Sequence, residues 1–266
     1  MQGIIKYYEE YDEASRLTTD YARSLEFITT TYVLDQYIGE GDRILDLGAG
    51  TGIYTFHYAD KGNPVVSTDL TPKHVAGIRS KITEKAYLNV SAEIADATDL
   101  SRYAAGSFEA VLCLGPMYHL TERSAQETCI QECLRVLKPG GILAAAYVNR
   151  LFILPSLVQH DRVFLSNQWM ERILDDKTIS SADDDCFWTD AFFHTPDEIK
   201  ALFEPYGVKK LEHVATDGIG RLINNTINQL SDEQFEIWKA YHLRTCSEPS
   251  ALGLSNHGLY LCRKGT

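Results

Sequence analysis

The chain has 266 residues, of which 44% are hydrophobic and 23% are charged. This length and composition predict one globular domain, or one domain with a cap, and exclude a repeat array or a disordered chain. Its 25 Lys and Arg residues against 37 Asp and Glu residues give a formal net charge of −12, which disfavours nucleic acid as a partner.

Two features of the sequence predict a cytoplasmic protein that does not bind a membrane. The longest apolar stretches, near residues 110–120 and 142–148, fall far short of the roughly 20 residues that span a bilayer. The first ten residues become acidic too early for a secretory signal peptide. We expect a monomer or a homodimer.

The six cysteines include no Cys-x-x-Cys pair, so we expect free, buried thiols. Cys129 and Cys133 lie four residues apart on a predicted helix, a spacing that a metal site can use. No His or acidic cluster completes such a site in the sequence. We therefore predict core packing for this pair and no metal ion.

Apolar residues at steps of three and four across residues 17–32 predict a long amphipathic helix that lies against the following sheet. From residue 43 onwards, short apolar runs alternate with helical stretches, which predicts a parallel sheet with helices on both faces. The five predicted strands are residues 43–47, 65–69, 90–95, 110–114 and 141–148. A helix between the last two ends at Lys138-Pro139-Gly140-Gly141.

Residues 151–194 interrupt this alternation, because they are rich in Phe, Trp and Leu and then acidic, and they predict an insertion. Thr195-Pro196-Asp197-Glu198 then begins a helix with a capping box, and Gly207 ends it. Residues 208–219 and 257–264 are expected as two last strands. A helix starting at Ser231 lies between them.

Residues 44–52, Ile-Leu-Asp-Leu-Gly-Ala-Gly-Thr-Gly, run from an apolar strand into three alternating glycines. Glycines allow a tight turn and close approach of a ligand, and the helix starting near Ile53 offers unpaired N–H groups. The bend predicts a nucleotide-sized binding site. The dinucleotide fingerprint G-x-G-x-x-G places its third glycine where this chain has Ile53, so a pyrophosphate site and a dehydrogenase are disfavoured.

Two carboxylates follow at the ends of the next predicted strands. Asp69 is expected at the sheet edge beside the glycines, where open α/β sheets bind ligands and a carboxylate accepts ribose hydroxyls. Asp96 can accept a hydrogen bond from an exocyclic amine while the Ala97 N–H donates to a ring nitrogen, a pattern typical of adenine recognition.

In this order the residues resemble the class I S-adenosylmethionine-dependent methyltransferases, of the type that acts on small molecules, over about residues 40–148. The resemblance implies S-adenosylmethionine as donor, with S-adenosylhomocysteine as product, and a Rossmann-like, mostly parallel seven-stranded sheet whose last strand is antiparallel. The residues matched to the donor-binding motifs are Asp46, Gly48, Ala49, Gly50 and Gly52 in the first motif, Asp69 for the ribose, and Asp96 and Ala97 for the adenine. Leu137-Lys138-Pro139-Gly140-Gly141 also agrees with the family.

The family further implies that backbone near Gly48 and Leu114 holds the methionine part, with Leu70 against the adenine. It also implies an N-terminal segment that folds over the donor, and we expect Tyr11 and Arg16 to contact it. The expected organisation is an N-terminal helical segment (1–40), a donor-binding core (41–150), an inserted lid or dimer contact (151–194) and a C-terminal completion of the sheet (195–266).

Methyl transfer from a sulfonium is an in-line displacement that depends mostly on alignment, and a base adds to it only when the acceptor loses a proton. Tyr118 and His119 follow the fourth strand near the expected methyl position, so we predict them as catalytic residues, with packing or loop-pinning roles as the alternative. His194 and His257 are further candidates for which structural roles are favoured.

Methyltransferases that modify amino groups of DNA bases carry Asp/Asn/Ser-Pro-Pro-aromatic at this point. Gly115 and Met117 replace two of those residues here, which argues against a nucleic-acid base as acceptor. The leading hypothesis is therefore methyl transfer to a small molecule through O, N or another nucleophile. Methylation of a protein side chain and a non-catalytic donor sensor or scaffold remain the alternatives.

Overall fold

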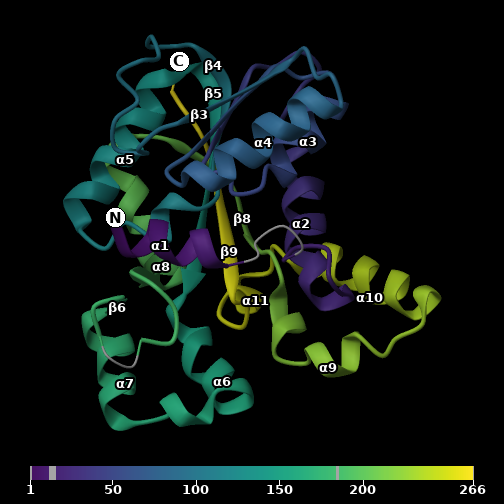
Figure 1. Ribbon diagram of the computed structural model, residues 1–266. Helices are drawn as coiled ribbons and strands as arrows, with labels where there is room; N and C mark the ends of the chain where they lie inside the picture. Colours follow the sequence, from purple (N-terminus) through teal and green to yellow (C-terminus); the bar gives the residue numbers. More distant parts are fainter. Residues whose placement is uncertain (1, 12–15, 184–185, 266) are drawn as a thin grey trace.

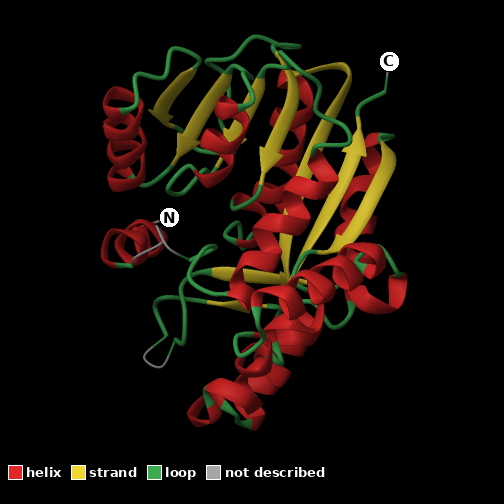
Figure 2. Ribbon diagram, turned by 90° about the vertical axis from the view of Figure 1, so that its right-hand side faces the viewer, coloured by secondary structure: helices red, strands yellow, loops and turns green. Residues whose placement is uncertain are grey.

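The structure is a computed structural model that describes residues 2–11, 16–183 and 186–265. Its centre is a twisted sheet with helices packed on both faces (Figures 1 and 2). Five strands pair in parallel in the order β3-β2-β1-β4-β5. They are β1 (Ile44–Leu47), β2 (Val65–Asp69), β3 (Val90–Ile94), β4 (Phe108–Cys113) and β5 (Leu137–Asn149).

The sheet is completed by β8 (Lys209–Ala215) and β9 (His257–Arg263). Strand β9 lies between β5 and β8 and pairs antiparallel with both. These seven strands confirm the expected Rossmann-like sheet with an antiparallel last strand. Two short strands that we did not expect, β6 (Thr178–Ile179) and β7 (Ala191–His194), extend the sheet from within the insertion, since β7 pairs with the end of β5.

Helices cover the two faces of the sheet through separate apolar clusters. On one face, α5 (Arg123–Val136) packs against β4 and β5 through buried residues that include Cys133, and α8 (Pro196–Phe203) packs against β7 and β9, with Phe203 stacked on Tyr260. On the other face, α3 (Ile53–Asp60) packs through Tyr54 and Tyr58. Helix α4 (Pro72–Glu84) packs against β2 and β3.

The N-terminal helical segment is divided into α1 (Gln2–Glu10) and α2 (Tyr21–Leu34). The helix expected from Leu17 begins at Tyr21 instead, because the Asp20 side chain accepts a hydrogen bond from the Arg23 N–H and caps the helix there. Only the second half of α2 contributes to the cluster against the sheet. Its first half packs against the C-terminal helices.

The insertion has an apolar cluster of its own, beyond the end of the sheet (Figure 1). It contains α6 (Arg150–His160), α7 (Asn167–Glu171), and short helical turns at Arg162–Phe164 and Arg172–Asp176. The rings of Phe164, Trp169 and Phe187 contact one another at its centre. Most of its aromatic residues therefore serve to hold the insertion together.

The C-terminal part contains α9 (Asn224–Ile227), α10 (Asp232–Thr245) and α11 (Pro249–Leu252), with 3₁₀ turns at Glu204–Tyr206 and Gly218–Arg221. The capping boxes expected at Thr195 and Ser231 are both present. In the described part of the chain, no helix has both the length and the apolar character that a membrane crossing requires.

Candidate active site

The three glycines after β1 form a bend that only glycine accommodates. Gly48, Gly50 and Gly52 have φ angles of +74°, +56° and +81°, in the left-handed region. A Cβ on Gly48 would lie 2.8 Å from Cδ of Pro116, in the 3₁₀ turn Pro116–Tyr118 after β4. The backbone of the bend thus lies directly against the loop that follows β4.

Asp69, at the end of β2, holds this bend in place. Its Oδ2 accepts a hydrogen bond of 2.8 Å from the Gly50 N–H, and its Oδ1 accepts one of 2.7 Å from the Thr71 N–H. Nδ1 of His74 lies 3.3 Å from Oδ1. Because each carboxylate oxygen accepts two hydrogen bonds, Asp69 retains acceptor capacity for a ligand at the bend.

Asp46, on β1, is a buried carboxylate beside the bend, with 1% of its surface exposed. Its Oδ2 accepts a hydrogen bond of 2.6 Å from the Thr55 hydroxyl, whereas its Oδ1 has no partner among the described residues. Burial raises the pKa of Asp46 to about 7, because the ionised form is poorly solvated. An unpartnered buried oxygen of this kind is suited to a ligand that carries positive charge.

A cavity opens over the bend at the carboxyl ends of β1 to β4. It contains about 1170 Å³ of space not occupied by protein, part of it open to solvent, which suffices for a ligand of nucleoside size. Most of the site residues predicted from the sequence line this cavity. They are Arg16, Asp46, Gly48, Ala49, Gly50, Asp69, Leu70, Asp96, Ala97, Leu114, Tyr118 and His119.

Two of the predicted residues do not line this cavity. Gly52 lies behind the bend, where it precedes α3 and a Cβ would meet Phe56 and Ile78. Tyr11 directly follows α1 and lines a second cavity instead. Asp96 lines the first cavity, and its Oδ1 accepts hydrogen bonds from the Thr98 N–H and hydroxyl.

His119 is hydrogen-bonded through both ring nitrogens. Nδ1 lies 2.9 Å from the Asp190 carbonyl oxygen, so it carries the proton and donates. Nε2 therefore accepts from the Tyr8 hydroxyl, 3.0 Å away. Loss of solvent lowers the pKa of His119 to about 4, which keeps the ring neutral near pH 7. In this geometry His119 positions the Tyr8 hydroxyl through Nε2.

Tyr8, on α1, is a site residue that the sequence analysis did not single out. Its ring contacts the rings of His74 and His119, with centroids 5.5 Å away in each case. Tyr8 lines both the first and the second cavity, as do Arg16 and Tyr118. The density of Tyr residues in the first helix is the sequence signal that pointed to this region.

The second cavity lies between the N-terminal segment, the insertion and β9, and contains about 770 Å³ of space, part of it open. Trp188 of the insertion lines it and contacts the rings of Tyr118 and His119, at centroid distances of 6.0 and 5.3 Å. His257, a further sequence candidate, lies in its wall. His194 lines neither cavity.

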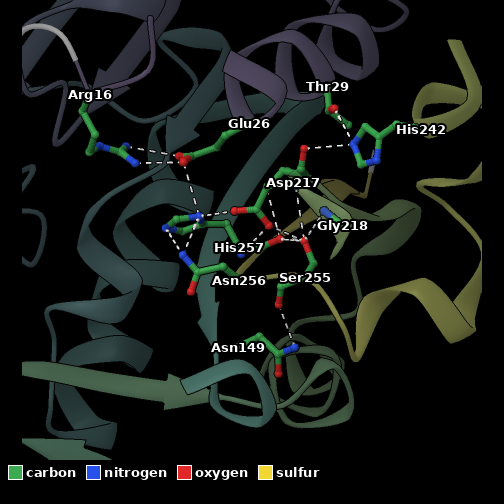
Figure 3. Close-up of polar contacts among 11 residues, drawn as sticks. Arg16, Glu26, Thr29, Asn149, Asp217, Gly218, His242, Ser255, Asn256 and His257 are labelled. Atoms are coloured by element: carbon green, nitrogen blue, oxygen red, sulfur yellow. Dashed lines mark hydrogen bonds and ion pairs between the residues drawn. The ribbon is translucent and has the colours of Figure 1, made fainter. Parts of the chain in front are cut away.

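A polar network links the walls of the two cavities (Figure 3). Arg16 donates hydrogen bonds to both carboxylate oxygens of Glu26, at 2.8 and 3.2 Å. Nδ1 of His257 lies 3.3 Å from Glu26 and 2.9 Å from Asp217, which also accepts from the Ser255 hydroxyl. Burial alone would raise the pKa of Asp217, but its hydrogen bonds from His257 and Ser255 outweigh this effect and hold the pKa below its usual value.

The cysteines are free, and five of the six are buried. Cys113 on β4 lies against Cys129 and Cys133 on α5, with the three Sγ atoms within 4.8 Å of one another. Sequence spacing indicated only the helical pair. Cys113 joins the pair because α5 packs on the sheet. The cluster is separate from both cavities.

Comparison with known proteins gives this site a family. A family model described as a methyltransferase domain matches residues 44–141, the segment that carries the bend, Asp69 and Asp96. Residues 44–141 are therefore similar to a methyltransferase domain, in agreement with the resemblance carried by the sequence motifs. Among similar proteins, the ubiquinone biosynthesis O-methyltransferase of Xanthomonas axonopodis pv. citri is 32% identical over 127 residues. That of Xanthomonas oryzae pv. oryzae (strain PXO99A) is 34% identical over 110 residues.

These matches are confined to part of each chain. The first covers 48% of this chain and 52% of the relative, and the second covers 41% and 44%, so the methyltransferase domain is matched and the remainder is not. The solved structure of the PH0226 protein from Pyrococcus horikoshii OT3 is similar over 97% of this chain and 98% of its own, with a TM-score of 0.66 at 18% identity.

A SAM-dependent methyltransferase from Methanosarcina mazei covers 88% of this chain and 97% of its own, with a TM-score of 0.60 at 17% identity. The [4+2]-cyclase SpnF covers 97% of this chain and 85% of its own, with a TM-score of 0.58 at 18% identity. Similarity at these identities concerns the fold alone, and a fold hosts more than one reaction.

Proposed function

We propose that the protein transfers a methyl group from S-adenosylmethionine, bound in the first cavity, to a small molecule in the second cavity. One observation carries the donor assignment: the glycine bend, Asp69 and Asp96 come from consecutive strand ends and line the same cavity. The acceptor is assigned to the second cavity because the two cavities share wall residues, and in-line transfer requires the acceptor to approach the donor from an adjoining space.

The first cavity fits such a donor in its chemistry. Asp69 has acceptor capacity for ribose hydroxyls, and Asp96 with the Ala97 N–H supplies an acceptor and a donor for adenine. A Cβ at Gly48 would displace the bend from Pro116, 2.8 Å away, so the absence of a side chain keeps the wall of the cavity in place. The unpartnered oxygen of Asp46 suits a cationic ligand, and S-adenosylmethionine supplies a methyl group activated by a positively charged sulfur.

Alignment is the main catalytic contribution that we assign to this chain. Holding two reactants in line is worth roughly 7–11 kcal/mol of a reaction barrier. Tyr8, Arg16 and Tyr118 lie in the walls of both cavities, so they confine the path between donor and acceptor. We assign His119 the role of fixing the Tyr8 hydroxyl, because its two nitrogens are occupied by Tyr8 and the Asp190 carbonyl.

We propose that the insertion, residues 151–194, closes the acceptor side. Ile153 and Trp188 reach the second cavity, while the remaining aromatic residues form the core of the insertion. Residues 1–40 would cover the donor, since Tyr8 and Arg16 line its cavity. Residues 41–150 would bind the donor and 195–266 complete the sheet. The net charge of −12 disfavours a nucleic-acid partner, and we place the enzyme in the cytoplasm.

The acceptor atom that we favour is oxygen, because the curated relatives of the domain are named O-methyltransferases. A second function has one specific observation in its favour. The fold also occurs in a protein named a cyclase, so a chain with this donor site can serve a reaction other than methyl transfer.

The proposal is tested by calorimetric titration of the folded protein with S-adenosylhomocysteine, followed by incubation of labelled S-adenosylmethionine with a panel of small hydroxyl and amine compounds. We expect donor-site binding and label transfer to at least one hydroxyl compound. Absence of binding by well-folded protein contradicts the donor assignment. Tight binding without transfer to any compound supports the non-transferring alternative.

A further inference from the structure

The charged residues that line the second cavity are basic in the described part of the chain, although the chain as a whole is acidic. This contrast bears on the acceptor, and its interpretation rests on the function proposed above. Arg16, Arg23 and Arg221 line the cavity, and none of its described lining residues is Asp or Glu. Chance does not favour this composition in a chain with 37 acidic against 25 basic residues. Three guanidinium groups facing one cavity indicate a ligand with negative charge.

Arg221 differs from the other two arginines in its partners. Arg16 is paired with Glu26, and Arg23 lies 3.7 Å from Asp20. Arg221 ends the 3₁₀ turn Gly218–Arg221 and is partly buried, and its side chain makes no hydrogen bond or ion pair with any residue that the structure describes. A partly buried guanidinium with its donors unused is a ready site for an oxyanion.

Among the residues that the structure describes, Glu26 and Asp217 contact His257 in the cavity wall, and each has other hydrogen-bond partners than Arg221. Glu26 is bound by Arg16 and His257. Asp217 is bound by Ser255 and His257, and Arg221 acts on it only through its charge (Figure 3). Among the described residues, the side-chain donors of Arg221 therefore stay available on this wall of the cavity.

Apart from Asn256 and His257, the other described residues that line the cavity are aromatic or apolar. The rings of Tyr7 and Tyr11 are stacked, with centroids 5.3 Å apart and an interplanar angle of 19°. Trp188 and Tyr118 contribute a second aromatic wall, with centroids 6.0 Å apart. Aromatic walls favour a planar ring, and the approximate 770 Å³ of space accommodates one with substituents.

We propose that the acceptor is a planar, aromatic oxyanion, and that Arg221 is the specificity-determining residue that binds its anionic group. The guanidinium donates two parallel hydrogen bonds to this group, and the aromatic walls hold the ring. The nucleophile of the acceptor then faces the boundary formed by Tyr8 and Tyr118. A carboxylate and a phosphate ester offer the same two-oxygen geometry, and the test separates them.

The test uses pairs of probes that match in shape and differ in charge: benzoate and benzamide, 4-hydroxybenzoate and its amide, and 2-naphthoate and its amide, together with phenyl phosphate. Their binding to the full chain is measured by equilibrium dialysis, with and without S-adenosylhomocysteine. We expect at least one anion to bind tenfold or more tightly than its neutral counterpart. Tighter binding of phenyl phosphate than of every carboxylate assigns the anion to a phosphate ester, and the reverse assigns it to a carboxylate.

Arg221→Met is expected to remove this preference while leaving the affinity for the amides unchanged, and Arg221→Lys to retain part of it. The matched control is Arg244→Met, an exposed residue of α10 that lines neither cavity and should keep the preference. Circular dichroism spectra and affinity for S-adenosylhomocysteine show that each variant is folded.

Absence of binding by every anionic probe, equal binding of anions and amides, or a preference that survives Arg221→Met overturns the inference. Failure of S-adenosylhomocysteine to bind contradicts the proposed function instead. The two failures are distinct because the probes are also measured without that ligand.

Discussion

Replacing Asp46 by Asn tests whether a cationic ligand binds beside the glycine bend. Burial raises the pKa of Asp46 to about 7, so about half of the unliganded molecules carry a proton on this group at pH 7. A positive charge placed near the carboxylate favours its ionised form and lowers the pKa. Binding of S-adenosylmethionine at pH 7 should therefore release about half a proton from Asp46, and almost none at pH 9.

The same pKa fixes the sign of a stability effect in the unliganded protein. The native pKa of Asp46 lies above the unfolded value of about 3.9. The stability associated with its proton is therefore fully present below about pH 3.9 and is lost as the pH rises through about 7. Three pKa units correspond to about 4 kcal/mol. Asp46→Asn should thus gain stability relative to the natural chain as the pH rises from 5 to 8, measured by urea unfolding.

Proton release is measured by calorimetric titration in phosphate and in Tris at pH 7, since the dependence of the heat on buffer ionisation enthalpy counts the protons. We expect about half a proton fewer released by Asp46→Asn than by the natural chain. The control is Asp96→Asn, the same chemical change at a partly exposed position of the same cavity, which should keep the release. Equal release by the natural chain and Asp46→Asn would refute the assignment of a cation to this position.

Three further results are expected. Gly48→Ala should weaken donor binding tenfold or more, because its Cβ would lie 2.8 Å from Pro116. The control Gly62→Ala, also at positive φ but with no atom within 4 Å of its Cβ, should leave the affinity unchanged in the same calorimetric titration. Asp69→Asn should weaken donor binding about tenfold to a hundredfold and lower unfolding stability by about 1–3 kcal/mol, because the amide has one acceptor oxygen for the Gly50 and Thr71 N–H groups. Burial lowers the pKa of His213 to about 4, so its contribution to stability is lost as pH falls below 6.5, by about 2 kcal/mol between pH 7 and 5; His213→Gln should lose this part of the pH dependence in urea unfolding.

The central sheet was predictable because its signals are local. Each parallel strand is a short apolar run that ends in a turn residue, and the predicted limits lie within four residues of those in the structure. The capping boxes at Thr195 and Ser231 are also encoded within four residues of sequence. The bend at residues 48–52 was predictable because its alternating glycines indicate positive φ angles, which the structure shows.

The parts that were not predicted depend on contacts between distant segments. Strand β7 forms because residues 191–194 reach the end of β5, a pairing that no local pattern indicates. Tyr8 enters the site through its hydrogen bond to His119, 111 residues away. Arg221 faces a cavity built from the N-terminal segment, the insertion and β9, so its position follows from tertiary packing alone.

The predicted catalytic pair shows the same limit. An unperturbed His has a pKa near 6.5, which suits a base, and His119 was expected near the methyl group on that ground. Its environment, and not its place in the sequence, lowers its pKa and occupies both nitrogens. The residues that we propose for donor binding lie at strand ends that the sequence indicates. The residues on the proposed acceptor side come from flanking segments, whose packing the sequence does not indicate.

The most direct test of the account is a crystal structure of the protein grown with saturating S-adenosylhomocysteine. The account predicts the nucleoside in the first cavity, with its ribose hydroxyls bound to Asp69 and its adenine beside Asp96 and Ala97. A ligand bound elsewhere, or a first cavity without the nucleoside at saturating concentration, would contradict it.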